Sequence, residues 1–182
     1  QGSRDFAILL LASSLGIRAS DICEMTLEAI NFVKNELCFI QKKTSVPLTL
    51  PLLPDVKEAL LGYLGCRKIN STDEPIFIQC RAPYHKLTRM GIWTIMRRYL
   101  KQSGVDPGHR KRGTHALRSS LASSMVREQV PYYAVQKILG HESPQSTKNY
   151  VRIDIGRLRE FTLPVPEAYG RFDAFLKGGE TR

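Results

Sequence analysis

Residues 115–118, His115-Ala116-Leu117-Arg118, decide the interpretation of this chain together with the group Leu139-Gly140-His141. Tyr150 follows nine residues after the histidine of the second group, and Arg18 near the start adds another arginine. Two arginines can hold a phosphate by charge-assisted, often bidentate hydrogen bonds. Histidines can transfer protons, and a tyrosine can act as a covalent nucleophile. Together these residue types can bind and attack a phosphodiester.

A pair of lysines, Lys42 and Lys43, adds candidate proton donors to this set. The lysines lie between two strand-like segments, residues 37–41 and 46–50, so the pattern predicts a hairpin of two strands with the lysines at its turn. Pro47 is expected to place the second strand at a sheet edge or at a bulge, because proline has no N–H for a neighbouring strand.

The charge of the chain indicates a polyanionic partner. Lys and Arg total 27 against 17 Asp and Glu, for a formal net charge of +10 and a pI near 9.7. Residues 86–118 hold nine Lys or Arg and one acid, whereas residues 20–74 hold eight acids and six bases. The positive charge is therefore concentrated around Arg118. The candidate DNA-binding residues are Arg97, Arg98, Lys101, Arg110, Lys111 and Arg112.

Length and composition point to one globular domain. A chain of 182 residues can bury about 70% of its unfolded surface in a single domain. The longest apolar run, residues 6–12, is too short to span a membrane, and no signal-peptide pattern opens the chain. The four cysteines lack C-x-x-C spacing, which argues against a zinc site and suits a reducing cytoplasm. We therefore expect a cytoplasmic, DNA-associated protein with no metal and no membrane partner.

Helical signals account for much of the first half of the chain. Residues 4–15 are predicted to form a buried helix that Gly16 ends. Ser20 is the expected N-cap of a second helix over residues 21–28. Residues 54–64 are predicted to form a helix with a proline in its first turn.

An amphipathic helix is predicted over residues 88–103, with Gly104 ending it. Its apolar stripe is expected to be part of the core, with Arg97, Arg98 and Lys101 lying off that stripe. The stripe consists of Ile92, Ile95, Met96 and Tyr99.

The two motifs of the last third are predicted to lie on helices. Thr114 is the expected N-cap of a helix over residues 115–128, so His115 and Arg118 share one face near its N-terminus. The dipole of that helix favours a phosphate at the same end.

A further helix is predicted over residues 131–139, stopped by Gly140, with Tyr132 and Tyr133 expected in the core. Ser143-Pro144 signals the start of a short helix that carries Tyr150.

In their order and spacing, these motifs resemble those of the tyrosine recombinase/integrase family, most closely the phage and transposon integrases. The resemblance covers most of the chain, from Arg18 to Tyr150. Residues 16–21 are similar to the first arginine motif of the family, which has an acidic residue three positions after the arginine, as Asp21 is here. Residues 41–44 are similar to the hairpin lysine motif, residues 115–118 match H-x-x-R, and Leu139-Gly140-His141 with Tyr150 matches the final box.

The resemblance implies a mainly α fold with a small antiparallel β-sheet (α+β), the catalytic core of the DNA breaking-rejoining enzymes. Residues 1–182 would form a single catalytic domain, with residues 161–182 as a C-terminal tail. The N-terminal core-binding domain of full-length family members is expected to be absent.

The resemblance also implies a metal-independent mechanism without a cofactor. Tyr150 would attack the scissile phosphate, form a 3′-phosphotyrosyl bond and free a 5′-hydroxyl. Arg18, Arg118 and His141 would stabilise the transition state with fixed donors. The 5′-hydroxyl of another strand would then reverse the step.

The remaining site residues have supporting or proton-transfer roles by the same resemblance. Lys43 would protonate the leaving 5′-oxygen, and Lys42 is the alternative for that position. His115 would assist proton transfer at the tyrosine, and Asp21 would orient a catalytic group.

The expected partners are double-stranded DNA recombination sites, further copies of the chain in a synaptic tetramer on DNA, and accessory DNA-bending proteins. Residues 161–182 either dock on a neighbouring protomer or pack on their own domain. Three other functions compete with this one: a type IB topoisomerase or hairpin-resolving enzyme, a non-catalytic DNA-binding regulator, and a basic RNA-binding domain. The helical Leu-Gly-His box, the intact residue set and the lack of an aromatic RNA-binding motif favour the recombinase.

Overall fold

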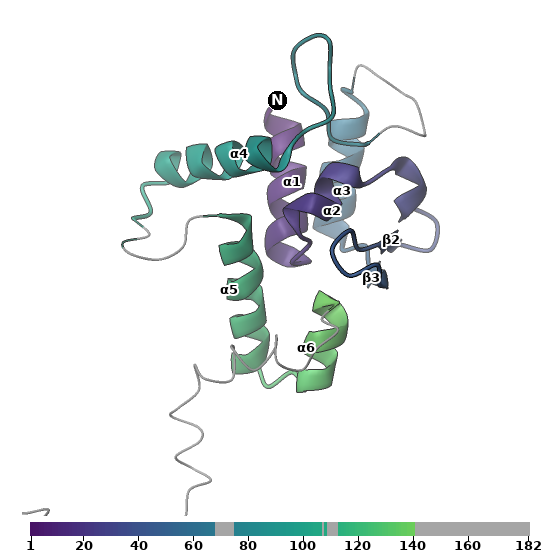
Figure 1. The fold of residues 1–182 in the computed structure, drawn as a ribbon, viewed down its shortest axis with the longest axis vertical. Helices are drawn as coiled ribbons and strands as arrows, with labels where there is room; N and C mark the ends of the chain where they lie inside the picture. Colours follow the sequence, from purple (N-terminus) through teal and green to yellow (C-terminus); the bar gives the residue numbers. More distant parts are fainter. Residues whose placement is uncertain (68–74, 107, 109–112, 141–182) are drawn as a thin grey trace, which may run out of the picture. The chain divides into compact units, whose positions relative to one another are not determined.

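Helices dominate the computed structural model, which describes residues 1–67, 75–106, 108 and 113–140 (Figure 1). The predicted class, mainly α with a small antiparallel sheet, is confirmed. None of the helices in the described ranges has the length and apolar character that crossing a bilayer requires. The elements are α1 (Gly2–Ser14), α2 (Ala19–Glu24), the 3-10 helix η1 (Leu27–Ala29), β1 (Ile30–Asn31), β2 (Glu36–Ile40), β3 (Pro47–Pro51), α3 (Pro54–Leu64), α4 (Arg89–Gln102), α5 (Thr114–Arg127) and α6 (Tyr132–Leu139).

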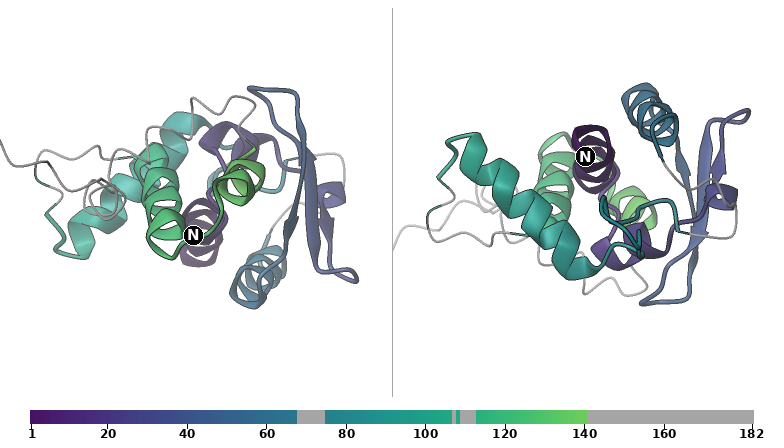
Figure 2. Two further views of the ribbon diagram at one scale, coloured as in Figure 1. Left: turned by 90° about the horizontal axis from the view of Figure 1, so that it is seen from below. Right: turned by 90° about the horizontal axis from the view of Figure 1, so that it is seen from above.

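The three strands form one antiparallel sheet in the order β1-β2-β3, which lies beside the helices in Figure 2. The predicted hairpin is confirmed, with each strand one residue further from the turn than the sequence indicates. Pro47 pairs with Ile40 on the edge strand β3, as expected for a residue without an N–H. The sequence does not predict β1, because two residues are too few for alternation to show.

Helix α1 supplies the centre of the main core. Its Ala7, Ile8, Leu11 and Ala12 are fully buried, and their helical spacing turns one face of α1 towards its neighbours α3 and α5. The helix predicted over residues 4–15 is confirmed, and it begins two residues earlier.

Two glycines end α1 and α6, as the sequence predicts. Gly16 has φ +64° and Gly140 has φ +58°, a left-handed conformation that costs glycine nothing because it has no Cβ. A Cβ added at Gly16 would lie 2.9 Å from Cδ2 of Leu139. The end of α1 therefore packs directly against the end of α6.

The predictions for α3 and α4 agree closely with the structure. Helix α3 has the predicted bounds. Thr88 caps α4 by accepting a backbone N–H of its first turn at 3.1 Å. Ile92, Ile95 and Met96 are buried, so the predicted stripe is part of the core.

The predicted start of α2 is wrong. Arg18, not Ser20, is the N-cap, because the carbonyl oxygen of Arg18 accepts the N–H groups of Asp21 and Ile22 at 2.9 and 3.0 Å. The helix also ends at Glu24, whereas the sequence predicts helix to residue 28. Arg18 is thus fixed at the point where the chain enters α2.

The predicted cap of α5 is wrong by one residue. Gly113 is the N-cap, and its carbonyl oxygen accepts the N–H of Ala116 at 2.8 Å. Thr114 is the first helical residue, so its position is already past the cap.

The expectation that Tyr132 and Tyr133 belong to the core is wrong as well. These residues are 42% and 70% exposed. Helix α6 is short and buries one stripe, Val135 and Leu139, in a small second core shared with α5. The tyrosines lie off that stripe, because a surface helix buries only the face that packs on its neighbour.

Candidate active site

Arg118 lies in the first turns of α5 with its guanidinium buried between the ends of two other helices. The residue is 3% exposed. Its Nη1 donates to the carbonyl oxygen of Gly16 at 2.6 Å, and its Nη2 donates to the carbonyl oxygen of Leu139. A planar guanidinium with several fixed N–H donors can bind two acceptors at once, which a lysine cannot do in the same geometry.

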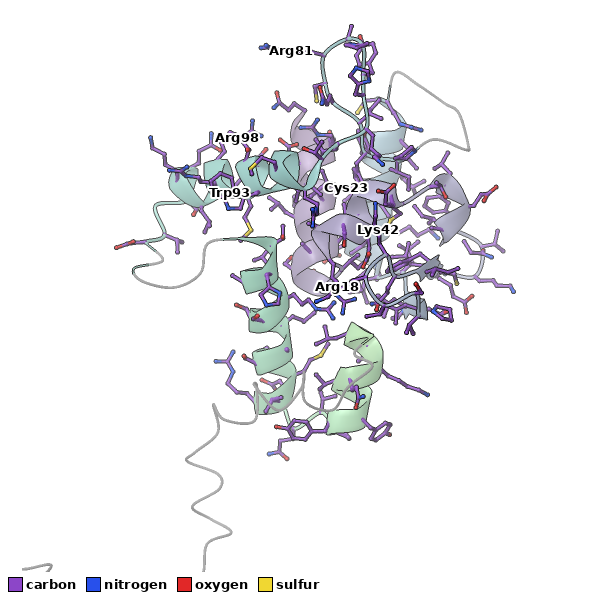
Figure 3. All side chains as sticks on the ribbon, in the orientation of Figure 1. Arg18, Cys23, Lys42, Arg81, Trp93 and Arg98 are labelled. Carbon is purple, nitrogen blue, oxygen red and sulfur yellow. The ribbon has the colours of Figure 1, made fainter. Side chains whose placement is uncertain are left out.

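Arg18 approaches the same place from the N-terminus of α2, as Figure 3 shows. Its Nη2 donates to the carbonyl oxygen of Gly140 at 3.4 Å. Its Nη1 is buried and has no hydrogen-bond partner in the described part of the chain. One donor group of this arginine is therefore unsatisfied within the described residues.

Arg18 and Arg118 thus converge on the C-terminal end of α6. The carbonyl oxygens of Leu139 and Gly140 are consecutive and carry the partial negative charge of a helix end. His141 follows at once in the sequence but lies outside the described residues, as does Tyr150. The structure brings the two arginines together beside the residue that precedes His141.

The lysine pair lies on the turn between β2 and β3, here named the lysine turn (residues 41–46). Lys42 and Lys43 are both exposed. The ammonium of Lys42, labelled in Figure 3, forms an ion pair with Glu24, and the ammonium of Lys86 lies 2.9 Å from the same carboxylate. The hydrogen bond from Lys42 lowers the pKa of Glu24, and the hydrogen bond from Lys86 lowers it further by a smaller amount. Lys43 has no ion pair within the described ranges.

Asp21 joins the lysine turn to α2. The residue is 4% exposed, and its Oδ1 accepts the backbone N–H of Lys42 at 3.0 Å and the hydroxyl of Ser20 at 3.3 Å. Oδ2 is buried with no partner among the residues described. The side chain therefore holds the backbone beside the candidate general acid, a contact that fits the supporting role predicted for it.

Gln41 is a site residue that the motif includes but to which the sequence assigns no role. It is 1% exposed, and its Nε2 donates to the carbonyl oxygen of Leu139 at 3.3 Å. The strand period contains the signal that could have identified it, because Gln41 is four positions after the buried Leu37 and so lies on the same face of the strand. A glutamine on the inward side of a strand needs buried hydrogen-bond partners.

His115 lies one turn before Arg118 on α5 and is exposed, although the two are near neighbours along the helix.

The described residues bring together part of the predicted site. Arg18, Arg118, Asp21 and Lys42 are linked through the lysine turn, Leu139 and Gly140.

The predicted DNA-binding residues of α4 differ in their contacts. Arg97 is exposed and its guanidinium lies 5.3 Å from the centre of the Trp93 ring, and Lys101 is also exposed. Arg98 instead forms an ion pair with the fully buried Asp5 of α1. This contact favours a structural role for Arg98. Arg110, Lys111 and Arg112 lie outside the described residues.

Comparison with known proteins identifies the same architecture. Residues 1–157 match the phage integrase family. The chain is 34% identical over 165 residues to the y4gC protein of Sinorhizobium fredii, covering 91% of this chain and 84% of that protein. It is 31% identical over 163 residues to tyrosine recombinase XerA of Pyrococcus furiosus, covering 86% of this chain and 53% of XerA.

Among solved structures, a lambda integrase (residues 75–356) dimer bound to a COC′ core site is similar, with a TM-score of 0.61 and 26% identity. The match covers 91% of this chain and 56% of the integrase. The chain thus spans little more than half the length of XerA and of this integrase chain.

Proposed function

The chain belongs to the phage integrase family, and on that basis we propose that it is a tyrosine recombinase that cuts and rejoins DNA through a 3′-phosphotyrosyl intermediate. The observation that carries the proposal is the convergence of Arg18 and Arg118 on consecutive carbonyl oxygens at the end of α6. The two guanidinium groups come from segments far apart in the sequence and meet immediately before His141.

The arginine pair supports phosphate binding by its donors and its surroundings. The acceptors that the arginines hold are backbone oxygens with partial negative charge, and a phosphate oxygen offers a stronger acceptor of the same kind. Nη1 of Arg18, which is buried and has no partner among the described residues, would be a further donor once the guanidinium turns towards a phosphate. Once bound to the phosphate, guanidinium donors stabilise the charge that develops on it in the transition state.

Tyr150 is proposed as the nucleophile. Its oxygen forms a bond to phosphorus as the bond from phosphorus to the 5′-oxygen breaks, so the energy of the phosphodiester is retained. A tyrosine ionises near pH 10, so deprotonating it at pH 7 costs about 4 kcal/mol. His141, His115 and the positive charge of the arginines would offset this cost.

Lys43 is proposed as the general acid that gives its proton to the leaving 5′-oxygen. Lys42 is held by Glu24, whereas Lys43 has no such ion pair in the part of the chain that the structure describes. An ammonium without a competing carboxylate is better placed to donate a proton to DNA.

Double-stranded DNA recombination sites are the proposed partner. A hollow beside the lysine turn is lined by four cationic side chains and by Glu24, and Arg97 and Lys101 are further exposed cations on α4. The four are Lys42, Lys43, Lys86 and Arg89. We further propose that strand exchange uses a tetramer on DNA, in which residues 161–182 dock on a neighbouring protomer and not on their own domain, and that DNA-bending proteins assist its assembly.

Covalent trapping tests the proposal. Nicked duplexes with randomised sequence around the nick would be incubated with the chain, and adducts would be separated under denaturing conditions. Because the fragment released at the nick diffuses away, the covalent complex accumulates. We expect an adduct on a definable subset of sequences, and none with Tyr150→Phe, which should still bind those sequences.

Two outcomes would contradict parts of the proposal. DNA binding without any adduct would favour a non-catalytic regulator. An adduct that persists in Tyr150→Phe and maps to another tyrosine would remove the nucleophile assignment. Rejoining to a second strand, as opposed to relaxation or hairpin sealing, distinguishes a recombinase from the topoisomerase-like alternative.

A further inference from the structure

We propose that Gln41 is a positioning residue. It fixes the lysine turn relative to Arg118 and to Gly140, the residue that precedes His141. The inference rests on the proposed function, because it assigns Gln41 a role in delivering the proton of the lysine to the leaving oxygen. Its support comes from contacts that one amide group makes in two directions.

On one side, Gln41 closes the lysine turn. Its Oε1 accepts the hydroxyl of Thr44 at 2.8 Å. Its backbone N–H donates to the carbonyl oxygen of Val46 at 3.0 Å, and its own carbonyl oxygen accepts the N–H of Ser45 at 2.8 Å. Ser45 has φ +55°, so the turn contains a left-handed residue that these bonds hold in place. Lys42 and Lys43 lie inside this closed segment.

On the other side, the same amide reaches the end of α6. Its Nε2 donates to the carbonyl oxygen of Leu139 at 3.3 Å, and that oxygen also accepts Nη2 of Arg118. A carbonyl oxygen has two lone pairs, so the two donors can share it. The lysine turn and the arginine are therefore placed relative to each other through a single backbone atom.

Close packing at Gly140 reinforces this link. A Cβ built on Gly140 would lie 2.3 Å from Nε2 of Gln41 and 2.6 Å from its Cδ. The amide thus rests on the backbone of the residue that precedes His141, at a distance that only a glycine permits. Moving Gln41 would shift the lysine turn relative to Leu139 and Gly140.

A glutamine is suited to this position because one group supplies both a donor and an acceptor without a charge. A methionine of similar length supplies neither, and a glutamate keeps the acceptor for Thr44 but loses the donor to Leu139. A misplacement of about 1 Å in a catalytic group can cost about 100-fold in rate. We therefore expect Gln41→Met and Gln41→Glu to slow cleavage by about 10- to 100-fold.

The leaving group provides a readout that a purely structural defect would not change. Two versions of a duplex recovered by covalent trapping would be compared, one with the natural 5′-oxygen and one with a 5′-sulfur at the scissile phosphate. A thiol ionises near pH 8.5, so a sulfur leaving group departs as thiolate without a general acid. The loss caused by the Gln41 variants should shrink to less than about threefold on the sulfur substrate, as for Lys43→Met.

Variants at other positions calibrate the measurement. Arg118→Lys should slow both substrates, because its donors act on the phosphate and not on the leaving group. Gln102→Met makes the same chemical change at an exposed position of α4 and should leave both rates unchanged. Thr44→Val removes only the bond within the turn and should give a smaller loss with the same substrate dependence.

Because both substrates are cut by the same folded fraction of a preparation, the ratio of the two rates holds even where a variant is partly unfolded. Equal losses on both substrates, or ordinary cleavage within about threefold of the parent chain, would overturn the role of Gln41. If the parent chain itself forms no adduct, the proposed function is what fails.

Discussion

The guanidinium of Arg118 donates to the carbonyl oxygen of Gly16 at 2.6 Å, which ties the start of α5 to the turn between α1 and α2. Through the same guanidinium, Leu139 at the end of α6 is joined to that turn. A residue expected to bind phosphate therefore also holds three helix ends together, and changing it should affect both activity and stability.

Arg118→Lys separates these two effects. A lysine keeps the charge but cannot reach both carbonyl oxygens, so a buried acceptor is left unsatisfied at a cost of about 1–3 kcal/mol in the free energy of unfolding. Loss of a fixed donor to the phosphate should lower the cleavage rate of the remaining folded protein by about 100-fold or more. Urea unfolding and adduct formation measure the two quantities. An unchanged unfolding midpoint would contradict the structural part.

Gly140→Ala tests the packing between α6 and the lysine turn, with Gly104→Ala as a matched control. Both glycines have positive φ, +58° and +69°, so an alanine at either costs about 1–2 kcal/mol in backbone strain. Only at Gly140 does a new Cβ meet another residue, Gln41, since nothing lies within 4 Å at Gly104. Gly140→Ala should therefore be the more destabilising by urea unfolding, and Gln41→Ala should partly relieve it. Equal effects of the two alanines would show that the packing does not matter.

Replacement of each lysine by methionine distinguishes the two candidates for the general acid. Lys42 is paired with Glu24, so Lys42→Met should reduce cleavage by less than about tenfold. Lys43→Met should reduce it by about 100-fold or more, because a positioned proton donor contributes about 100- to 10,000-fold. Initial rates of adduct formation measure both variants. The reverse order would assign the role to Lys42.

Arg97 and Arg98 are adjacent, yet their contacts predict different phenotypes. DNA affinity should fall with salt at a log–log slope of about −0.9 for each phosphate neutralised, so Arg97→Gln should reduce the steepness of that slope by about 0.9. Arg98→Gln should leave the slope unchanged and lower the free energy of unfolding by about 1 kcal/mol, because Asp5 loses an ion-pair partner. Titrations at several salt concentrations and urea unfolding make the comparison. A slope change for Arg98→Gln would restore it as a DNA contact.

Cys23 should be the least reactive of the four cysteines. Burial, followed by the charge of Glu24, raises the pKa of the Cys23 thiol to about 11 from an ordinary value of 9.0, whereas Cys38, Cys66 and Cys80 are exposed. Iodoacetamide at pH 8.5 should therefore label the exposed three first, as mass spectrometry would show.

The raised pKa of Cys23 also makes the stability of the folded chain depend on pH. The folded chain holds the Cys23 proton more tightly than the unfolded chain does, so this contribution is complete below pH 9 and is lost as the pH rises through about 11. Cys23→Ala should lessen the fall in unfolding free energy over that interval. Rapid labelling of Cys23 in the folded protein would contradict its burial.

Local chemistry was enough to predict most of the helices and the hairpin, and the ordered motifs were recognised from their resemblance to the family. Gly16 and Gly140 stop helices because a left-handed backbone is available to glycine at no steric cost, and the proline at the start of residues 54–64 fits the first turn of a helix. Two short strand-like segments on either side of Lys42 and Lys43 were enough to predict the hairpin. These features depend on neighbours within a few residues.

The placements of His141 and Tyr150 remain predictions from the sequence.

The contacts of the site depend on residues that meet across the fold. No local pattern indicates that Gln41 and Arg118 share the carbonyl oxygen of Leu139, or that Arg98 pairs with Asp5. A side chain's periodic position gives the direction in which it points but not which helix end or carboxylate lies there. That depends on how distant elements pack to bury their apolar faces, and on the need of every buried polar atom for a partner.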